Sequence, residues 1–120
     1  MKTVKTKEAR IKDEENRLRA VYSDLDSQKK IVADGLIQRA AYYRVTLEDF
    51  ESDLDQNGYT ERFQQGKTQD PYDRKRPIAD MYTSMSALYQ KCTKQLTDLL
   101  PKEDGKQENE DELLGFISGR

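Results

Sequence analysis

The sequence predicts an all-α protein, a helical hairpin of two long helices plus an N-terminal helix, which works by assembling into an oligomer. Three observations lead to this prediction. Apolar side chains recur every three or four residues along two long segments, which is the spacing of one helix face. Both segments end at strong helix stops, Asn57-Gly58 and Pro101. Apolar residues make up only 34% of the 120 residues, so one copy can bury little and oligomerisation would add buried area.

The N-terminal helix is predicted over Lys7 to Tyr22. Its narrow apolar stripe runs through an otherwise charged segment and consists of Ile11, Leu18, Tyr22 and Leu25. The turn formers of Ser23–Ser27 follow, and Asp26 or Ser27 is placed to accept hydrogen bonds from the first free N–H groups of the next helix.

The second helix is predicted over Gln28 to Asp55, about 42 Å at 1.5 Å per residue. Its apolar seam, spaced four, three, four, three, four, consists of Leu36, Ala40, Tyr43, Leu47, Phe50 and Leu54. Small residues leave a thin waist where another backbone can approach, namely Ala33, Gly35, Ala40 and Ala41.

The third helix is predicted from about Ile78 to Leu100, with Pro77 placed at its start. Its matching seam consists of Ile78, Tyr82, Met85, Tyr89, Cys92, Leu96 and Leu99. We expect the two seams to meet in an antiparallel hairpin, and hairpins to pack side by side in an oligomer.

Three regions follow from this pattern. Residues 1–26 are expected to form a basic helical segment, and residues 27–101 are expected to form the hairpin core for oligomerisation. The core includes a long polar connection, residues 59–77, which we expect to contact a neighbouring subunit or to be ordered by a ligand. Residues 102–120 form an acidic, flexible tail. Its apolar group is expected to dock a partner or to pack back on its own ring, and consists of Leu113, Leu114, Phe116 and Ile117.

Charge is distributed unevenly although the net charge is only −2. Residues 1–20 carry seven Lys or Arg against four acids, whereas residues 102–120 carry three against six. A basic start suggests a polyanion such as duplex DNA. The candidate DNA-binding cations are Lys2, Lys5, Lys7, Arg10, Lys12, Arg17, Arg19, Lys29 and Lys30. The competing interpretation is a solvated helix of mixed charge, and a second basic cluster, Arg74-Lys75-Arg76, carries the same two interpretations.

Catalytic signatures are weak. The chain has no histidine, which excludes Ser-His and Cys-His nucleophiles and the usual zinc sites. Gly66-Lys67-Thr68 lacks the earlier glycine and the preceding strand of a phosphate-binding loop. The acids of the second helix, Glu48, Asp49, Glu51, Asp53 and Asp55, fit a solvated or ion-paired surface better than a two-metal site. We therefore expect no enzyme activity, no metal and no cofactor, and we interpret Cys92 as a buried apolar group. No apolar run reaches the length of a membrane span and no secretory signal is evident, so we expect a cytosolic protein.

The segments LIQRAAYYRVTLEDFESDLDQNG and ADMYTSMSALYQKCTKQLTDLLP, within Leu36–Gly58 and Ile78–Pro101, resemble the small subunits of tailed-phage terminases. In that family a helix ending at Asn-Gly is followed by a Gly/Gln-rich connection and a helix closing in a motif like KQLTDLLP. The segment PYDRKRP is more basic than the family pattern. The resemblance implies a non-catalytic ring that binds double-stranded viral DNA and recruits and regulates the large ATPase-nuclease subunit during viral genome packaging. It also implies residence in the cytoplasm of the infected bacterial host, not in the virion. The alternative is a helical adaptor or regulatory protein that self-associates without binding DNA.

Overall fold

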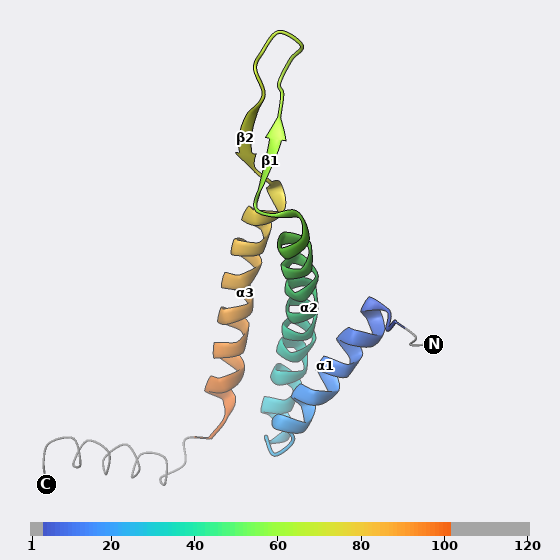
Figure 1. Cartoon of the computed structure of the whole chain (residues 1–120). Coiled ribbons are helices and arrows are strands. Elements are labelled where there is room, and N and C mark those ends of the chain that lie inside the picture. The colour runs from blue at the N-terminus through green and yellow to red at the C-terminus, as the bar shows by residue number, and fades with distance from the viewer. Residues whose placement is uncertain (1–3, 102–120) are drawn as a thin grey trace, which may run out of the picture.

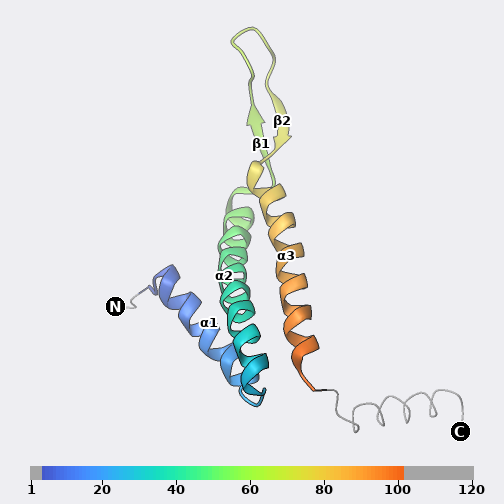
Figure 2. The same cartoon turned by 180° about the vertical axis from the view of Figure 1, so that it is seen from behind.

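The structure, a computed structural model, describes residues 4–101. Its elements in chain order are α1 (Lys7–Val21), α2 (Ser27–Asn57), β1 (Thr60–Phe63), β2 (Tyr72–Lys75) and α3 (Pro77–Leu99). In both views α2 lies between α1 and α3, the β-hairpin extends the joined end of α2 and α3, and α1 crosses α2 obliquely (Figures 1 and 2). The mostly helical fold confirms the predicted class, whereas the ring stays a prediction.

The helix ends follow the signals in the sequence. Asp26 caps α2 by accepting a hydrogen bond from the Lys29 backbone N–H at 2.9 Å, as one of the two predicted caps. Gly58 ends α2 with a φ of 80°, a conformation in which a Cβ is unfavourable. Pro77 occupies the first turn of α3, where its missing N–H has no cost. The predicted helix bounds are therefore correct to within two residues.

The two predicted seams face each other inside one chain. Leu47, Leu54 and Leu96 are buried, and Ala40 has no exposed surface. The thiol of Cys92 donates a hydrogen bond to the Leu36 carbonyl at 3.2 Å, and burial raises the pKa of that thiol. The seams thus close the hairpin intramolecularly, so they do not by themselves require a neighbouring copy. Not every seam residue is fully covered: Phe50 and Met85, for example, are only half-buried.

A second buried stripe on α2, which the sequence analysis missed, supports α1. Ile37, Ala41 and Val45 follow at four-residue spacing and are all buried. The end of α1 and the following turn supply Leu18 and Leu25, which join Ile37, Ala40, Cys92 and Leu96 in one core cluster. The alanines of the thin waist are buried where helices approach, whereas a Cβ on Gly35 would meet nothing within 4 Å.

The connection 59–77 is folded by contacts within the chain, and the expected contact with a neighbouring subunit or a ligand stays a prediction. It forms an antiparallel β-hairpin whose register pairs Thr60 with Lys75, Glu61 with Arg74, Arg62 with Asp73 and Phe63 with Tyr72. Opposite charges therefore meet across the strands, and the Phe63 and Tyr72 rings contact edge-on with centroids 5.8 Å apart. Such cross-strand pairs are what stabilise a two-stranded sheet.

Arg76 fixes the base of this hairpin to the end of α2. One of its Nη atoms donates to the Gly58 carbonyl at 2.7 Å and the other to Asp53 at 2.8 Å. Its backbone N–H also donates to the Tyr59 carbonyl at 2.8 Å. Because the Arg76 side chain is only 18% exposed, these bonds are partly shielded from water and tie the hairpin firmly to the helices.

Candidate functional site

The structure pairs many of the predicted DNA-binding cations with carboxylates of the same chain. The ion-paired residues are Lys5 with Asp13, Arg10 with Glu48 and Asp49, Arg17 with Glu14, and Arg19 with Glu15 and Asp34. The ammonium of Lys7 lies 4.9 Å from the Tyr42 ring centroid, a cation–π contact. No ion pair joins Lys12, Lys29 or Lys30 to another residue that the structure describes, and Lys2 lies outside the described residues.

Arg10 joins the N-terminal half of α1 to α2. Its guanidinium donates to Asp49 at 2.6 Å and to Glu48 at 3.2 Å. The hydrogen bond to Asp49 is the main reason that the pKa of Arg10 lies above its ordinary value. The Arg10 side chain is 32% exposed, so solvent screens these ion pairs only in part. The two acids that α2 contributes are therefore charge partners of α1.

Arg17 and Glu14 form a second pair, within α1. Arg17 donates from Nε at 2.6 Å and from one Nη at 2.7 Å, a bidentate geometry. The hydrogen bond from Arg17 is the largest cause of the lowered pKa of Glu14. A hollow of about 290 Å³ between α1 and α2 is lined by Arg10, Asp13, Glu14, Arg17, Arg44, Val45 and Glu48. The positive and negative side chains in this lining balance, so the hollow is no simple anion site.

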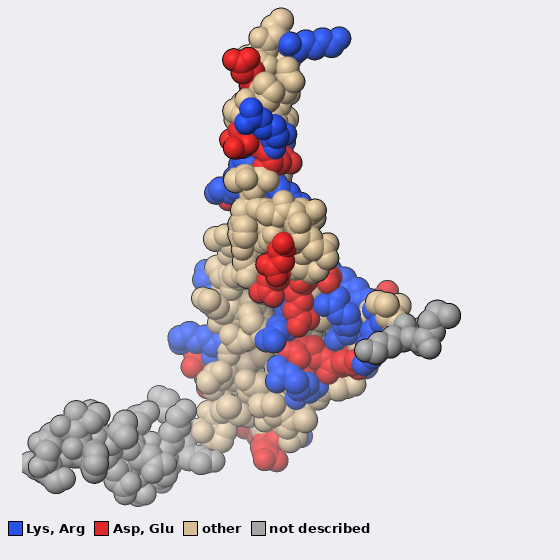
Figure 3. All heavy atoms as spheres, in the orientation of Figure 1, with Lys and Arg blue, Asp and Glu red and all other residues tan. Residues whose placement is uncertain are grey.

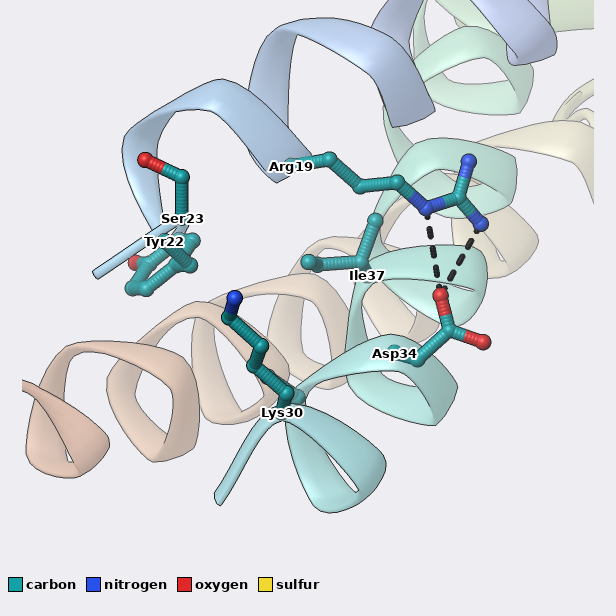
Figure 4. A pocket seen from close by; sticks show the side chains of 7 residues that line it. Arg19, Tyr22, Ser23, Lys30, Asp34 and Ile37 are labelled. Carbon is teal, nitrogen blue, oxygen red and sulfur yellow. Dashed lines mark hydrogen bonds and ion pairs between the residues drawn. The ribbon is translucent and has the colours of Figure 1, made fainter. Parts of the chain in front are cut away.

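Figure 4 shows a further hollow where the end of α1 passes over the start of α2. Arg19 donates to Asp34 at 3.0 and 3.1 Å on one side of it, and Lys30 extends from α2 on the other. Ile37 and Tyr22 supply apolar surface. The hollow has a volume of about 270 Å³. The Arg19 guanidinium is already paired with the Asp34 carboxylate, so Lys30 is the cation of this hollow that makes no ion pair with a described residue.

Charges of both signs alternate over the region where α1 meets α2. Figure 3 shows red and blue side chains intermingled there, without a continuous basic surface on the visible face of the described residues. The predicted cations that the structure describes lie on α1, just before it or at the start of α2, and carboxylates of α1 and α2 accompany them. Sequence spacing alone could not show these partners, because Arg10 and Asp49 are 39 residues apart.

The second basic cluster, Arg74-Lys75-Arg76, is also engaged internally. Arg74 donates to Glu61 at 2.7 Å and stacks 3.5 Å from the Phe63 ring centroid. Lys75 pairs with Asp80 at 2.9 Å. Together with the two bonds of Arg76 at the hairpin base, these contacts favour a structural role for this cluster.

One side of α3 keeps apolar side chains in solvent. Met81 is 54% exposed and Leu88 is 46% exposed, and their seven-residue spacing puts both on one face, beside the seam that contains half-buried Met85. On another side of α3, Gln90 lines a hollow with Arg44 and Glu48 of α2. Each residue turns the helix by about 100°, so Leu88 points roughly 200° away from Gln90. We call Met81 and Leu88 the open apolar face.

Two further acids of α2 have hydrogen-bond partners within the chain. Glu51 accepts a hydrogen bond from Tyr82 at 2.8 Å, and Asp53 accepts from Asn57 and Arg76. Within residues 4–101 no group of three or more His, Cys, Asp or Glu side chains is arranged to hold a metal ion. Over the same residues, no helix combines the length and apolar character needed to cross a bilayer.

The apolar group of the predicted tail, Leu113, Leu114, Phe116 and Ile117, lies outside the described residues. Comparison of the sequence with protein-family models, curated proteins and solved structures found no significant match. Function must therefore be argued from the residues and their arrangement.

Proposed function

We propose that this chain is the non-catalytic small subunit of a phage DNA-packaging terminase. In this proposal several copies form a ring, bind double-stranded viral DNA and recruit and regulate the large ATPase-nuclease subunit. The protein acts in the cytoplasm of the infected bacterium and is not part of the virion.

The observation that carries the proposal is the open apolar face of α3. This face belongs to a helical hairpin built from the two segments that resemble terminase small subunits. The segments 36–58 and 78–101 form most of α2 and α3, which pack together as antiparallel partners with buried Leu47, Leu54 and Leu96. With the two seams closed inside the chain, Met81 and Leu88 remain exposed at helical spacing. A second copy of the chain is the occupant we propose for this face, since a ring requires a heterologous contact on each subunit.

Native mass spectrometry of the intact assembly tests self-association. We expect the wild-type chain to give a defined oligomer and Leu88→Asp to lower its mass, because an unpaired charge would be buried in the contact. The matched control is Gln90→Asp, which adds the same charge two residues away on another side of α3. A monomeric wild type, or equal loss from both variants, contradicts the proposed contact.

Salt-dependent binding to duplex DNA tests the second part. Each phosphate contact should steepen the fall of log K with log salt by about 0.9, so affinity should drop clearly between about 50 and 200 mM salt. Substituting Lys12, Lys29 and Lys30 together with glutamine should weaken binding and flatten that slope. An affinity that does not change with salt contradicts phosphate contacts.

Docking of the large subunit is tested with a chain truncated after Pro101. We expect the truncated chain to keep its oligomeric mass and to lose its stimulation of the large subunit's ATPase. Full stimulation by the truncated chain would place the docking surface elsewhere.

The second candidate is a helical adaptor or regulatory protein that self-associates without binding DNA. The internal ion pairs of Arg10, Arg17 and Arg19 favour this candidate, because these guanidinium groups are already occupied. An oligomer with no DNA affinity even at low salt would support it over the terminase proposal.

A further inference from the structure

The strongest remaining feature is the uneven way in which α1 is held on α2. At the C-terminal end of α1, Leu18 is buried at 8% exposure, and Leu25 beyond the turn is buried at 6%. None of the side chains of residues 7–14 is buried. This N-terminal half of α1 is attached to α2 by the ion pairs of Arg10 and by the contact of Lys7 with the Tyr42 ring. The C-terminal end of α1 is therefore anchored by buried apolar side chains, whereas its N-terminal half combines these charge contacts with a single half-buried aliphatic side chain, Ile11.

The carboxylates of Asp49 and Glu48 bind the Arg10 guanidinium through the same kind of contact that a DNA phosphate would make. Carboxylates and phosphates both accept charge-assisted hydrogen bonds from arginine. Asp49 accepts from one Nη at 2.6 Å, and Glu48 accepts from the other at 3.2 Å, so both Nη groups already have an acceptor. A guanidinium has further N–H donors, but a phosphate that binds them while both carboxylates stay in place lies close to two negative charges that repel it. A phosphate therefore gains the full attraction of Arg10 only when at least one of these carboxylates is displaced.

We infer that Asp49, assisted by Glu48, is a built-in competitor that masks Arg10 from DNA in the free protein. This inference rests on the proposed DNA-binding function and adds a regulation to it. DNA binding through α1 then includes an exchange, in which Arg10 leaves the α2 carboxylates for the DNA backbone. The exchange discriminates against isolated or weak anions, because a single phosphate gains little over the carboxylates that it replaces, whereas a duplex offers several phosphates at once.

The expected change in DNA affinity follows from the solvent exposure of the Arg10–Asp49 ion pair. Arg10 and Asp49 are 32% and 44% exposed, and a pair of this kind shifts an equilibrium by only about 1.5- to 5-fold. Removing the competitor should tighten DNA binding by about that factor. It should also steepen the salt dependence by up to about one unit of slope, because Arg10 then contributes a full phosphate contact.

The test compares Asp49→Asn with Asp55→Asn in the full chain, using a duplex DNA of random sequence and a series of salt concentrations. Both substitutions remove one negative charge from α2, but no hydrogen bond or ion pair among the described residues involves Asp55. We expect Asp49→Asn to bind DNA about 1.5- to 5-fold more tightly than wild type and Asp55→Asn to resemble wild type. Equal gains from both variants would mean a general charge effect and would overturn the inference.

A double-mutant cycle with Arg10→Gln makes the test specific. If Arg10 is the masked group, the gain from Asp49→Asn disappears when residue 10 is glutamine. A gain that persists without Arg10 overturns the assignment. Should Asp49→Asn lose helical circular dichroism, Glu48→Gln, which removes the 3.2 Å partner, takes its place in the same cycle.

The failure of the inference can be told apart from the failure of the proposed function. If wild type binds DNA and Asp49→Asn binds no better, only the masking is wrong. If neither chain binds DNA at low salt, the DNA-binding part of the proposed function is wrong and the masking falls with it.

Discussion

Truncating Leu96 to alanine should destabilise the whole three-helix arrangement. Leu96 is 1% exposed and is the largest fully buried side chain among the described residues. It lies in the core cluster that contains Leu18 of α1, Ile37 of α2 and Cys92 of α3. Loss of this side chain therefore weakens the packing that all three helices share.

The expected cost can be estimated from this burial. Leu→Ala substitutions in cores cost about 2–5 kcal/mol, the larger values applying where the cavity cannot collapse. Complete enclosure between helices places Leu96 in the upper part of that range, about 3–4 kcal/mol. For a domain of this size such a loss lowers the melting temperature by about 15–25 °C.

Urea unfolding followed by circular dichroism at 222 nm measures this cost, with Leu88→Ala as the matched control. Leu88 is on the same helix but is 46% exposed, so its truncation should cost less than about 1 kcal/mol. The measurement is made at low protein concentration, because self-association would add burial at Leu88. If both variants lose similar stability, or if Leu96→Ala costs under about 1 kcal/mol, the described core is wrong.

Other positions give sharp contrasts between matched variants. Arg76→Gln should lower the free energy of unfolding by about 1–3 kcal/mol, because its partly buried acceptors lose a charged donor. In the same urea experiment Arg62→Gln should lower it by under about 0.5 kcal/mol, because the Arg62 side chain is 67% exposed in its ion pair with Asp73. Gly58→Ala should lower stability by about 1 kcal/mol because of the positive φ, and Gly66→Ala, with open space around its Cβ position, should be neutral by thermal melting. Glu14 has a pKa below its ordinary 4.5, so it stabilises the folded state above that pH and loses the contribution as pH falls through its folded pKa. The stability difference between wild type and Glu14→Gln should therefore be largest at neutral pH and shrink in acid, and a difference independent of pH would contradict this ion pair.

The helices were predictable because each carries a local signal. The four-three spacing from Leu36 to Leu54 marks the face that packs on α3, and Asp26, Gly58 and Pro77 mark ends whose chemistry is set within one turn. These signals come from residues that are close together in the sequence, so they can be recognised before the tertiary contacts are known.

The β-hairpin and the charge partners could not be predicted in the same way. Strands Thr60–Phe63 and Tyr72–Lys75 have no apolar alternation, and their stabilising pairs, such as Glu61 with Arg74, become visible only once the register is known. The basic residues of α1 stood out in the sequence, but the acid that occupies Arg10 lies on another helix. Charge along a helix is thus readable from the sequence, whereas its availability to a ligand is a tertiary property.

The buried thiol of Cys92 makes the chain convenient for spectroscopy. It is the single cysteine in the sequence, it is 6% exposed, and burial keeps it in the unreactive protonated form. A thiol-directed dye or spin label should therefore not react with Cys92. It should react with a single cysteine introduced at an exposed site, such as the position of Lys67 in the hairpin tip. Distances between labels on neighbouring copies could then be measured without altering the core.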